Sequence, residues 1–172
     1  MNLLPLNKNI TRGLSEYDMQ KQVDNYIKNT KFYKIDNKYP YKKILLQPDI
    51  FREIHNGNIG RISDHVIYFS PKRIINIECK LTAIDCVIKQ AKDHLLWADY
   101  SIIIIPPDIT YVTNKHFQEI LDSGIGLTYW FNNIGLFEFI LPRKSKQINQ
   151  FIRNDMIRFI ESIKLEIIKE QQ

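Results

Sequence analysis

The strongest pattern of apolar and polar positions in this chain lies in residues 61–81. Four apolar residues in its second half are spaced two apart, as on one face of a β-strand: Ile75, Ile77, Cys79 and Leu81. In the first half, Ile67 and Phe69 have the same spacing and would face the same apolar side. Residues 70–73, Ser-Pro-Lys-Arg, separate the two halves and are typical of a turn. The pattern therefore predicts a β-hairpin.

Three charged residues are predicted to share the other face of this hairpin. If the loop has three residues, the numbers of paired positions add to an even total, and Asp64 then faces Glu78 or Lys80. A two-residue loop with odd pairing would place the acids on opposite faces. The apolar set favours the even register, because a slip of one residue turns every side chain over. Two acids and an ammonium are costly to bury without partners, so their grouping indicates a metal-binding site.

Four other stretches have the apolar spacing of helices. Residues 15–28 begin with Ser15 as an N-cap and Asp18 as its capping partner. Residues 84–97 and 113–121 are two further predicted helices, and residues 147–171 are predicted to form a long terminal helix. The inward side chains of the first helix are expected to be Tyr17, Val23, Tyr26 and Ile27. One side of the terminal helix is apolar at Ile148, Phe151, Ile152, Met156, Phe159, Ile160, Ile163 and Ile167.

The remaining strands follow the hairpin. Residues 100–105 are almost entirely apolar, which is typical of a central strand covered on both faces. Residues 126–131 and 135–141 are predicted to be two strands joined by a turn at Asn132 and Asn133. Weaker patterns favour a short strand over residues 31–36 and a turn of helix over residues 49–55. The predicted fold class is α/β, with a mixed central sheet of about five strands flanked by helices. The chain is predicted to form one domain, preceded by an N-terminal arm over residues 1–13.

The charged residues of the hairpin resemble the motif of the PD-(D/E)xK nuclease superfamily. Ser63-Asp64 stands where that family has Pro-Asp, Glu78-Cys79-Lys80 is the ExK element, and Gly60-Arg61 before the first acid is also similar to the family. The resemblance covers about residues 60–106 and departs from the pattern at Ser63, a position where the family often varies. It implies a three-layer restriction-endonuclease-like core and metal-dependent hydrolysis of DNA, with a layout nearest to small DNA-repair and junction-resolving branches. Small restriction enzymes and phage nucleases are also compatible.

The resemblance also implies roles for individual residues. The carboxylates of Asp64 and Glu78 and the backbone carbonyl of Cys79 would bind Mg²⁺, or Mn²⁺ in its place. Lys80 would orient the attacking water or stabilise negative charge, and the two acids favour its ammonium form. Glu16 is in the place of an acid that the family often brings from its first helix. Gln90 shares a face of the 84–97 helix with His94, where relatives often have a Gln, Lys or Tyr.

Each of these assignments has a plainer alternative. The plainer interpretation of the three hairpin charges is a salt-bridge cluster on an exposed sheet face, where each pair contributes only about 0–1 kcal/mol. An acid such as Glu16 near a helix N-terminus is favoured by the helix dipole alone. Gln90 could lie on a solvated helix face. At the level of function, the alternative is an inactive nuclease-like DNA-binding or accessory subunit, or a basic protein whose partner is another protein.

Net charge and composition add less. The formal net charge is +5 and the isoelectric point about 9.1, which fits DNA as a partner but also fits the Lys, Ile and Asn bias of an AT-rich genome. Contacts with the DNA backbone are expected from Arg61, Lys72, Arg73, Lys42 and Lys43, and the basic residues at 143–146 are a further candidate. Solvated loops are the plainer interpretation of each basic stretch.

Cysteine usage and hydropathy limit the compartment and the partners. Cys79 and Cys86 are too few for a disulfide framework or a zinc site, so both are expected to be reduced in an intracellular, cytoplasmic protein of a low-GC bacterium or its phage. No apolar run approaches the ~20 residues that a membrane helix needs. Nearly the whole chain belongs to the predicted core, so an enzyme of this kind is expected to select DNA structure, to act as a homodimer or to work beside a partner subunit.

Overall fold

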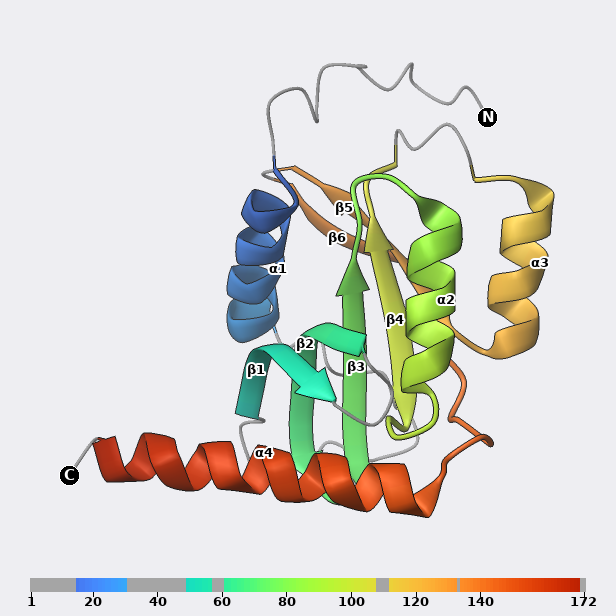
Figure 1. Cartoon of the computed structure of the whole chain (residues 1–172). Helices are drawn as coiled ribbons and strands as arrows, with labels where there is room; N and C mark the ends of the chain where they lie inside the picture. The colour runs from blue at the N-terminus through green and yellow to red at the C-terminus, as the bar shows by residue number, and fades with distance from the viewer. Residues whose placement is uncertain (1–14, 31–48, 57–60, 108–111, 133, 171–172) are drawn as a thin grey trace, which may run out of the picture.

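The computed structural model describes residues 15–30, 49–56, 61–107, 112–132 and 134–170 (Figure 1). The short strand predicted over residues 31–36, the N-terminal arm, and Lys42 and Lys43 lie outside the described residues. The described elements, in chain order, are α1 (Glu16–Thr30), β1 (Asp49–Asn56), β2 (Arg61–Ser70), β3 (Arg73–Cys79), α2 (Ile84–His94), β4 (Tyr100–Ile105), α3 (Asn114–Ser123), β5 (Gly126–Phe131), β6 (Gly135–Ile140) and α4 (Gln150–Glu170).

The strands form one mixed sheet in the order β1-β2-β3-β4-β5-β6. The β3–β4 and β4–β5 pairs are parallel, and the other three pairs are antiparallel. The predicted α/β class and mixed sheet are confirmed, and β4 and β5 have the predicted bounds. The prediction of about five strands is wrong, because the described sheet has six.

The additional strand is β1, where a turn of helix was predicted. Phe51 and Ile54 are three residues apart, which is a helical spacing, and both are buried in the same apolar cluster. The segment nevertheless pairs with β2 along its length, from Asp49 opposite Tyr68 to Asn56 opposite Arg61. Glu53 has a left-handed φ of 52° between the two buried residues. This local change of backbone direction lets a strand carry buried side chains at a spacing that normally indicates a helix.

The β2–β3 hairpin has the predicted even register, but its turn is shorter than predicted and a β-bulge makes up the difference. His65 faces Ile77 and Ile67 faces Ile75, while Ser70 faces Arg73, so the turn itself contains only Pro71 and Lys72. The expected three-residue loop is therefore wrong. A β-bulge between Tyr68 and Ser70 shifts the register by one residue and restores the even pairing for the rest of the hairpin. The residues predicted to share an apolar face do so, in a cluster with side chains of α1.

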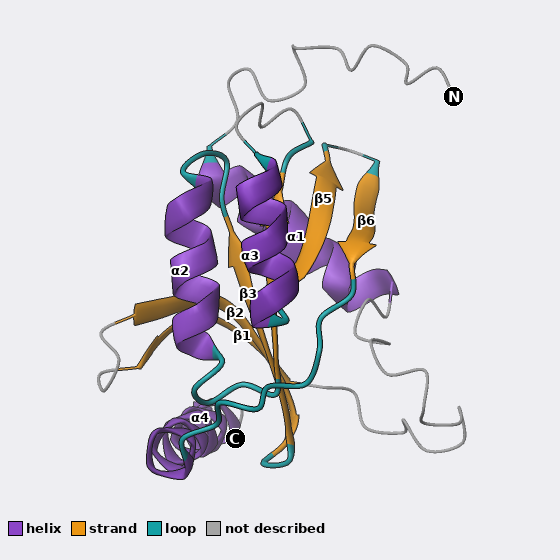
Figure 2. Cartoon of the chain, turned by 90° about the vertical axis from the view of Figure 1, so that its right-hand side faces the viewer, coloured by secondary structure: helices purple, strands orange, loops and turns teal. Residues whose placement is uncertain are grey.

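Helices cover both faces of the sheet (Figures 1 and 2). Met19, Val23 and Ile27 of α1 pack on one face, where they contact the odd-numbered residues of β3. The apolar side chains of α2 pack on the other face, with Ile103 and Ile105 of β4, and they are Ile84, Val87, Ile88 and Ala91. β4 is therefore covered on both sides, as its all-apolar sequence predicted, since Ile102 and Ile104 belong to the α1 side. The parallel strands end beside the N-termini of α1 and α2.

The helix predictions hold for the elements and fail for some side chains. Ser15 and Asp18 form the predicted cap of α1, with hydrogen bonds in both directions. Tyr17 is 58% exposed and does not face inward, so that prediction is wrong. α2 ends at His94 rather than at residue 97, and α4 begins at Gln150 rather than at residue 147. Of the predicted apolar side of α4, Met156 and Ile160 are buried, but three of its members are exposed: Phe151, Phe159 and Ile167.

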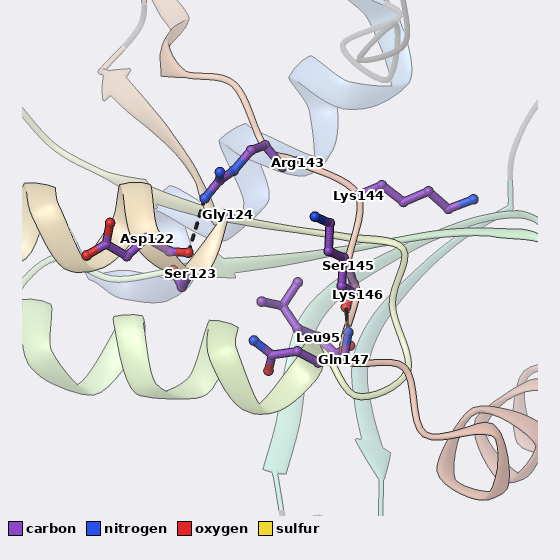
Figure 3. Close-up of a pocket in the computed structure, with 9 residues that line it drawn as sticks. All are labelled: Leu95, Asp122, Ser123, Gly124, Arg143, Lys144, Ser145, Lys146 and Gln147. Carbon is purple, nitrogen blue, oxygen red and sulfur yellow. Dashed lines mark hydrogen bonds between the residues drawn. The ribbon is translucent and has the colours of Figure 1, made fainter.

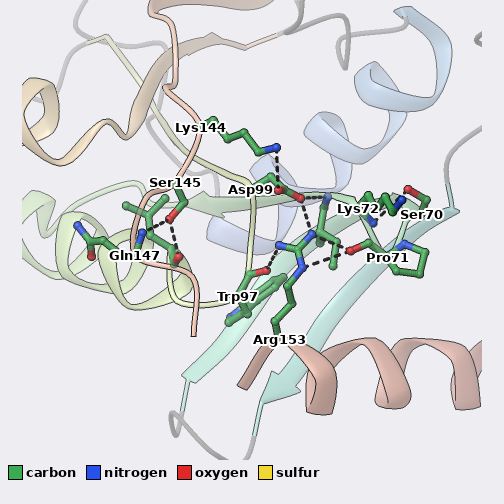
Figure 4. A network of polar contacts seen from close by, with 11 residues as sticks. Ser70, Pro71, Lys72, Trp97, Asp99, Lys144, Ser145, Gln147 and Arg153 are labelled. Carbon is green, nitrogen blue, oxygen red and sulfur yellow. Dashed lines mark hydrogen bonds and ion pairs between the residues drawn. The ribbon is translucent and has the colours of Figure 1, made fainter. Parts of the chain in front are cut away.

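A buried arginine attaches α4 to the sheet (Figure 4). Arg153 donates from Nη2 to Asp99 Oδ2 at 2.7 Å and from Nη1 to the Trp97 carbonyl oxygen at 2.8 Å. It also donates to the Pro71 carbonyl oxygen in the β2–β3 turn. Asp99 Oδ2 accepts a second hydrogen bond from the Ile74 N–H at 2.8 Å. One guanidinium therefore joins α4, the β2–β3 turn and the entry to β4.

Candidate active site

The three charged residues of the hairpin lie at the carboxyl end of β3, where the chain leaves the sheet for α2. In open α/β sheets this edge is where ligands normally bind, because side chains from several elements converge there. β3 ends at Cys79, so Lys80 is the first residue beyond it, and its N–H donates to the Ile104 carbonyl of β4 at 3.0 Å. The sequence placed Asp64, Glu78 and Lys80 on one face, but each head group has a different partner in the structure.

Asp64 bonds the backbone of the neighbouring strand. The ladder between β2 and β3 is formed from the Ser70–Arg73 pair to the His65–Ile77 pair, and Asp64 is the next residue of β2. Its Oδ2 accepts a hydrogen bond of 2.7 Å from the Cys79 N–H. A carboxylate thus replaces a strand carbonyl as the acceptor at the point where β2 and β3 part. The Asp64 head group is held beside the backbone of Glu78-Cys79-Lys80.

Glu78 is almost fully buried and faces α2. Its Oε1 lies 3.0 Å from Nε2 of His94, whose side chain is completely buried. The distance suits a hydrogen bond, but the angles do not, and neither atom has another hydrogen-bond partner among the described residues. On its other side, the His94 ring accepts at Nδ1 a hydrogen bond of 3.1 Å from the Trp97 indole N–H. Glu78, His94 and Trp97 therefore form a buried row behind the acidic edge.

Lys80 extends to the opposite side and meets α1. Its Nζ donates to Glu16 Oε1 at 2.6 Å, and the two side chains are about one quarter and one third exposed. Glu16 is the first residue of α1, so the capped N-terminus of this helix determines where the acid lies. The structure thus brings the predicted first-helix acid to the ExK lysine.

The groups at this edge interact electrostatically. Burial raises the pKa of Asp64 to about 7, and the negative charge of Glu78 adds to this rise. The Cys79 N–H and the Lys80 ammonium oppose it without cancelling it. Partial burial lowers the pKa of Lys80, but its bond to Glu16 and the charges of Glu16 and Asp64 outweigh that effect, so the pKa is raised overall. Lys80 is therefore an ammonium at neutral pH, whereas Asp64 ionises near pH 7.

The chemistry of these donors fits a divalent cation. Mg²⁺ prefers oxygen ligands and keeps several waters, so two carboxylates suffice as its protein anchors. Glu78 Oε1 is a buried carboxylate oxygen that accepts no hydrogen bond from the residues the structure describes, and Asp64 is held close to a second negative charge. A cation would offset both costs. Within the described ranges, no three His, Cys, Asp or Glu side chains converge as a ready metal-binding group, so backbone oxygens and water would complete the coordination.

The α2 residue that contacts Glu78 is His94. Gln90 is half-buried and accepts a weak contact from Cys86 Sγ at 3.6 Å, and no hydrogen bond in the described part of the chain joins it to the acids. His94 lies one turn later on the same helix and contacts Glu78. A sequence signal for this existed, since His94 and Trp97 are three residues apart and can meet on one helix face.

The basic residues lie away from the acids. Lys72 and Arg73 are at the turn of the β2–β3 hairpin, at the opposite end of β3 from Glu78, and the Arg73 guanidinium stacks 4.9 Å above the Phe69 ring. Arg61 begins β2, but its side chain lies outside the described part of the structure. Any contact of Lys72 or Arg73 with DNA would therefore be made about 20 Å along the sheet from the acidic edge.

A hollow of about 200 Å³ lies at the C-terminal end of α2 (Figure 3). Its basic lining consists of Arg143, Lys144 and Lys146. Arg143 donates to the carbonyl oxygens of Leu121 and Asp122 at the end of α3. Lys144 is 64% exposed and lies 3.8 Å from Asp99. The candidate basic stretch at 143–146 is thus partly used to hold the fold and partly exposed.

Comparisons with known proteins add little to this geometry. No family model matches the chain, and no curated protein matches it. It is similar to the structure of the SPO1766 protein of unknown function from Silicibacter pomeroyi, with a TM-score of 0.48 and 16% identity over 72% of this chain and 81% of that one. It is also similar to SfsA from Pyrococcus furiosus in complex with Ca²⁺, with a TM-score of 0.27 and 16% identity over 54% of this chain and 53% of that one. Similarities this distant assign no function.

In the part of the chain that the structure describes, no helix is long and apolar enough to span a membrane. Both cysteines are free, Cys79 within the core and Cys86 on the surface. Burial raises the pKa of the Cys79 thiol well above its usual value, so this sulfur remains a thiol while the backbone of the same residue contacts Asp64.

Proposed function

We propose that this chain is a metal-dependent endonuclease of the PD-(D/E)xK type, with a three-layer restriction-endonuclease-like core, that hydrolyses phosphodiester bonds in DNA. The observation that carries the proposal is the grouping of Asp64, Glu78, Lys80 and Glu16 at one edge of the sheet. The charges of the other three residues all act on the pKa of Asp64: Glu78 and Glu16 raise it, and Lys80 lowers it. Strongly shifted acids of this kind are concentrated in functional sites.

The residues at this edge have distinct proposed roles. Bound Mg²⁺ or Mn²⁺ would supply an activated water and neutralise charge on the phosphate. Asp64 and Glu78 would hold the ion, with the Cys79 carbonyl as a further oxygen ligand. Lys80 keeps its positive charge and is suited to stabilise the negative charge that develops during hydrolysis. Glu16 would orient Lys80 through the 2.6 Å contact between their head groups.

A second candidate function is a DNA-binding or accessory subunit without turnover. The observation that favours it is that Lys80 is bonded to Glu16 and Glu78 is in contact with His94. Charges engaged in this way would also be found in a nuclease-like fold that has lost catalysis. Whether the protein is a homodimer or works with another subunit is part of the same proposal.

Cleavage assays separate these candidates. Wild type and Asp64→Ala are incubated with supercoiled, single-stranded and branched DNA, in Mg²⁺ or in EDTA. We expect wild type to cleave only with Mg²⁺, and Asp64→Ala to be about 100-fold slower or more while DNA binding changes little. Asp49→Ala is the matched control, because Asp49 is a strand aspartate that pairs with Lys164 on the surface. DNA binding without cleavage of any substrate would favour the accessory subunit.

A further inference from the structure

The row formed by Glu78, His94 and Trp97 has a defined direction. The indole N–H of Trp97 can only donate, so the His94 Nδ1 that it contacts must be an acceptor and carries no proton. A neutral imidazole with an unprotonated Nδ1 has its proton on Nε2. That nitrogen lies 3.0 Å from Glu78 Oε1. The contact is therefore an N–H donor facing a carboxylate oxygen.

This row is buried and held on several sides. The side chain of His94 is fully buried and that of Glu78 is 2% exposed, so water cannot replace either partner easily. Trp97 is also fully buried, and its carbonyl oxygen accepts from Arg153 of α4. Such a contact costs free energy unless both groups are satisfied, and within the described part of the chain Glu78 Oε1 and His94 Nε2 have no alternative partner. A small rotation of the carboxylate would complete the bond.

We propose that His94 is a positioning residue for Glu78, whose Nε2–H fixes Oε1 and leaves the second carboxylate oxygen for the cation. This inference rests on the proposed function, because it gives Glu78 the role of a metal ligand. Carboxylates that bind metals are commonly held by such an outer hydrogen bond, and removal of the bond typically weakens metal binding by about 10- to 100-fold. Trp97 acts one step further out, by selecting the imidazole tautomer.

The tautomer can be measured without any metal. Long-range ¹⁵N–¹H correlation spectra of the metal-free protein report which ring nitrogen of His94 carries the proton. We expect the Nε2–H form in wild type and a shift toward the Nδ1–H form in Trp97→Phe, which keeps an aromatic ring but has no indole N–H. A wild-type spectrum with the proton on Nδ1 would overturn the proposal.

Metal binding is then measured by titration calorimetry with Mn²⁺ as the probe, on DNA-free protein. We expect His94→Leu to bind Mn²⁺ about 10- to 100-fold more weakly than wild type. His94→Gln, whose amide keeps an N–H donor, should stay within about 3-fold of wild type, and it answers the question if the leucine variant fails to fold. Equal losses in both variants would show that only the shape of the imidazole matters, which contradicts the proposal.

His116→Leu is a matched control. Its ring also accepts at Nδ1, from the Thr113 N–H at 3.0 Å, and its Nε2 also lies 3.0 Å from a carboxylate, the exposed Asp85. We expect Mn²⁺ binding by this variant to equal that of wild type. If wild type binds Mn²⁺ and His94→Leu binds it equally well, the role of His94 is refuted while the proposed function stands. If folded wild type binds no Mn²⁺, the proposed metal dependence itself is refuted.

Discussion

At the residue scale, the site depends on how each buried or half-buried charge is compensated. Asp64 accepts from a backbone N–H, Lys80 pairs with the Glu16 carboxylate, and Glu78 lies beside an imidazole without hydrogen-bond angles. Of these three, only the contact of Lys80 is an ion pair between fully charged side chains. The charge of Asp64 is poorly compensated, since burial and Glu78 together raise its pKa to about 7. Its ionisation at neutral pH therefore works against folding in the absence of a cation.

The free energy of unfolding is expected to depend on pH through the ionisation of Asp64. The pKa of Asp64 is higher in the folded protein than in the unfolded chain, so the folded state binds the proton more tightly and stability falls as pH rises from about 4 through 7. Asp64→Asn removes this cost. We expect the variant to be more stable than wild type at pH 8, by up to roughly 3 kcal/mol, with the gain disappearing toward pH 4.

Urea unfolding at pH 4, 6 and 8 in the presence of EDTA measures this difference. Asp49→Asn provides the comparison, because it removes a surface aspartate whose pair with Lys164 contributes about 0–1 kcal/mol. A constant difference between Asp64→Asn and wild type at all three values of pH would contradict the prediction.

At the element scale, α4 is held by the buried contacts of Arg153 as well as by its apolar residues Met156 and Ile160. Arg153 is 6% exposed and its partner Asp99 is 2% exposed, so both charges are buried and depend on each other. Asp99 also accepts the Ile74 N–H, which links the start of β3 to the start of β4. Removing one partner of such a pair leaves an uncompensated charge in the interior.

We therefore expect Arg153→Met to destabilise the fold by about 3–5 kcal/mol. Arg158→Met is the matched control in the same helix. Arg158 pairs with Asp155 but is 74% exposed, so its loss should cost about 0–1 kcal/mol. Thermal and urea unfolding of both variants test this, and equal losses would show that the buried pair has no special role. In Arg153→Met/Asp99→Asn, part of the lost stability should return, because no buried charge is left unpaired.

At the scale of the whole molecule, the charge distribution and the apolar surface suggest partners. The basic residues at 143–146 lie beside Leu95, at the C-terminal end of α2. Toward its C-terminus, α4 has large apolar residues on its surface, namely Leu165, Ile167 and Ile168. The terminal helix therefore does not use its whole apolar side to close the core. A homodimer remains a prediction that mass measurement in solution can test.

Binding of DNA is expected to depend strongly on salt. If Lys144 and Lys146 contact phosphates, Lys144→Gln/Lys146→Gln should weaken binding and reduce the slope of log affinity against log salt by up to about 1.8, or roughly 0.9 for each lost contact. Lys21→Gln/Lys169→Gln changes two other exposed lysines by the same charge and should leave the slope unchanged. Fluorescence anisotropy at several salt concentrations measures both. An affinity independent of salt would instead indicate a protein partner.

The sequence by itself determined the elements whose signal is local. The alternating apolar residues of β3 predicted which of its faces is buried, and the helical spacing of apolar residues in α2 predicted which side of this helix packs on the sheet. The all-apolar sequence of β4 predicted that both of its faces are buried. These patterns work because a strand repeats every two residues and a helix every 3.6, so a few neighbouring positions define a face. The Ser15 cap of α1 is local for the same reason.

Tertiary structure decided the remainder. β1 is a strand because it pairs with β2, although its own apolar spacing is helical, and the bulge at the end of β2 corrects the register of a turn shorter than expected. The partners of the charges were also beyond the sequence, since Glu16 and Lys80 are 64 positions apart and Glu78 meets His94 only after α2 packs on the sheet. The local spacing of apolar residues predicts which face of an element a side chain lies on. The residue that this side chain contacts depends on how distant segments pack, and no local pattern contains that information.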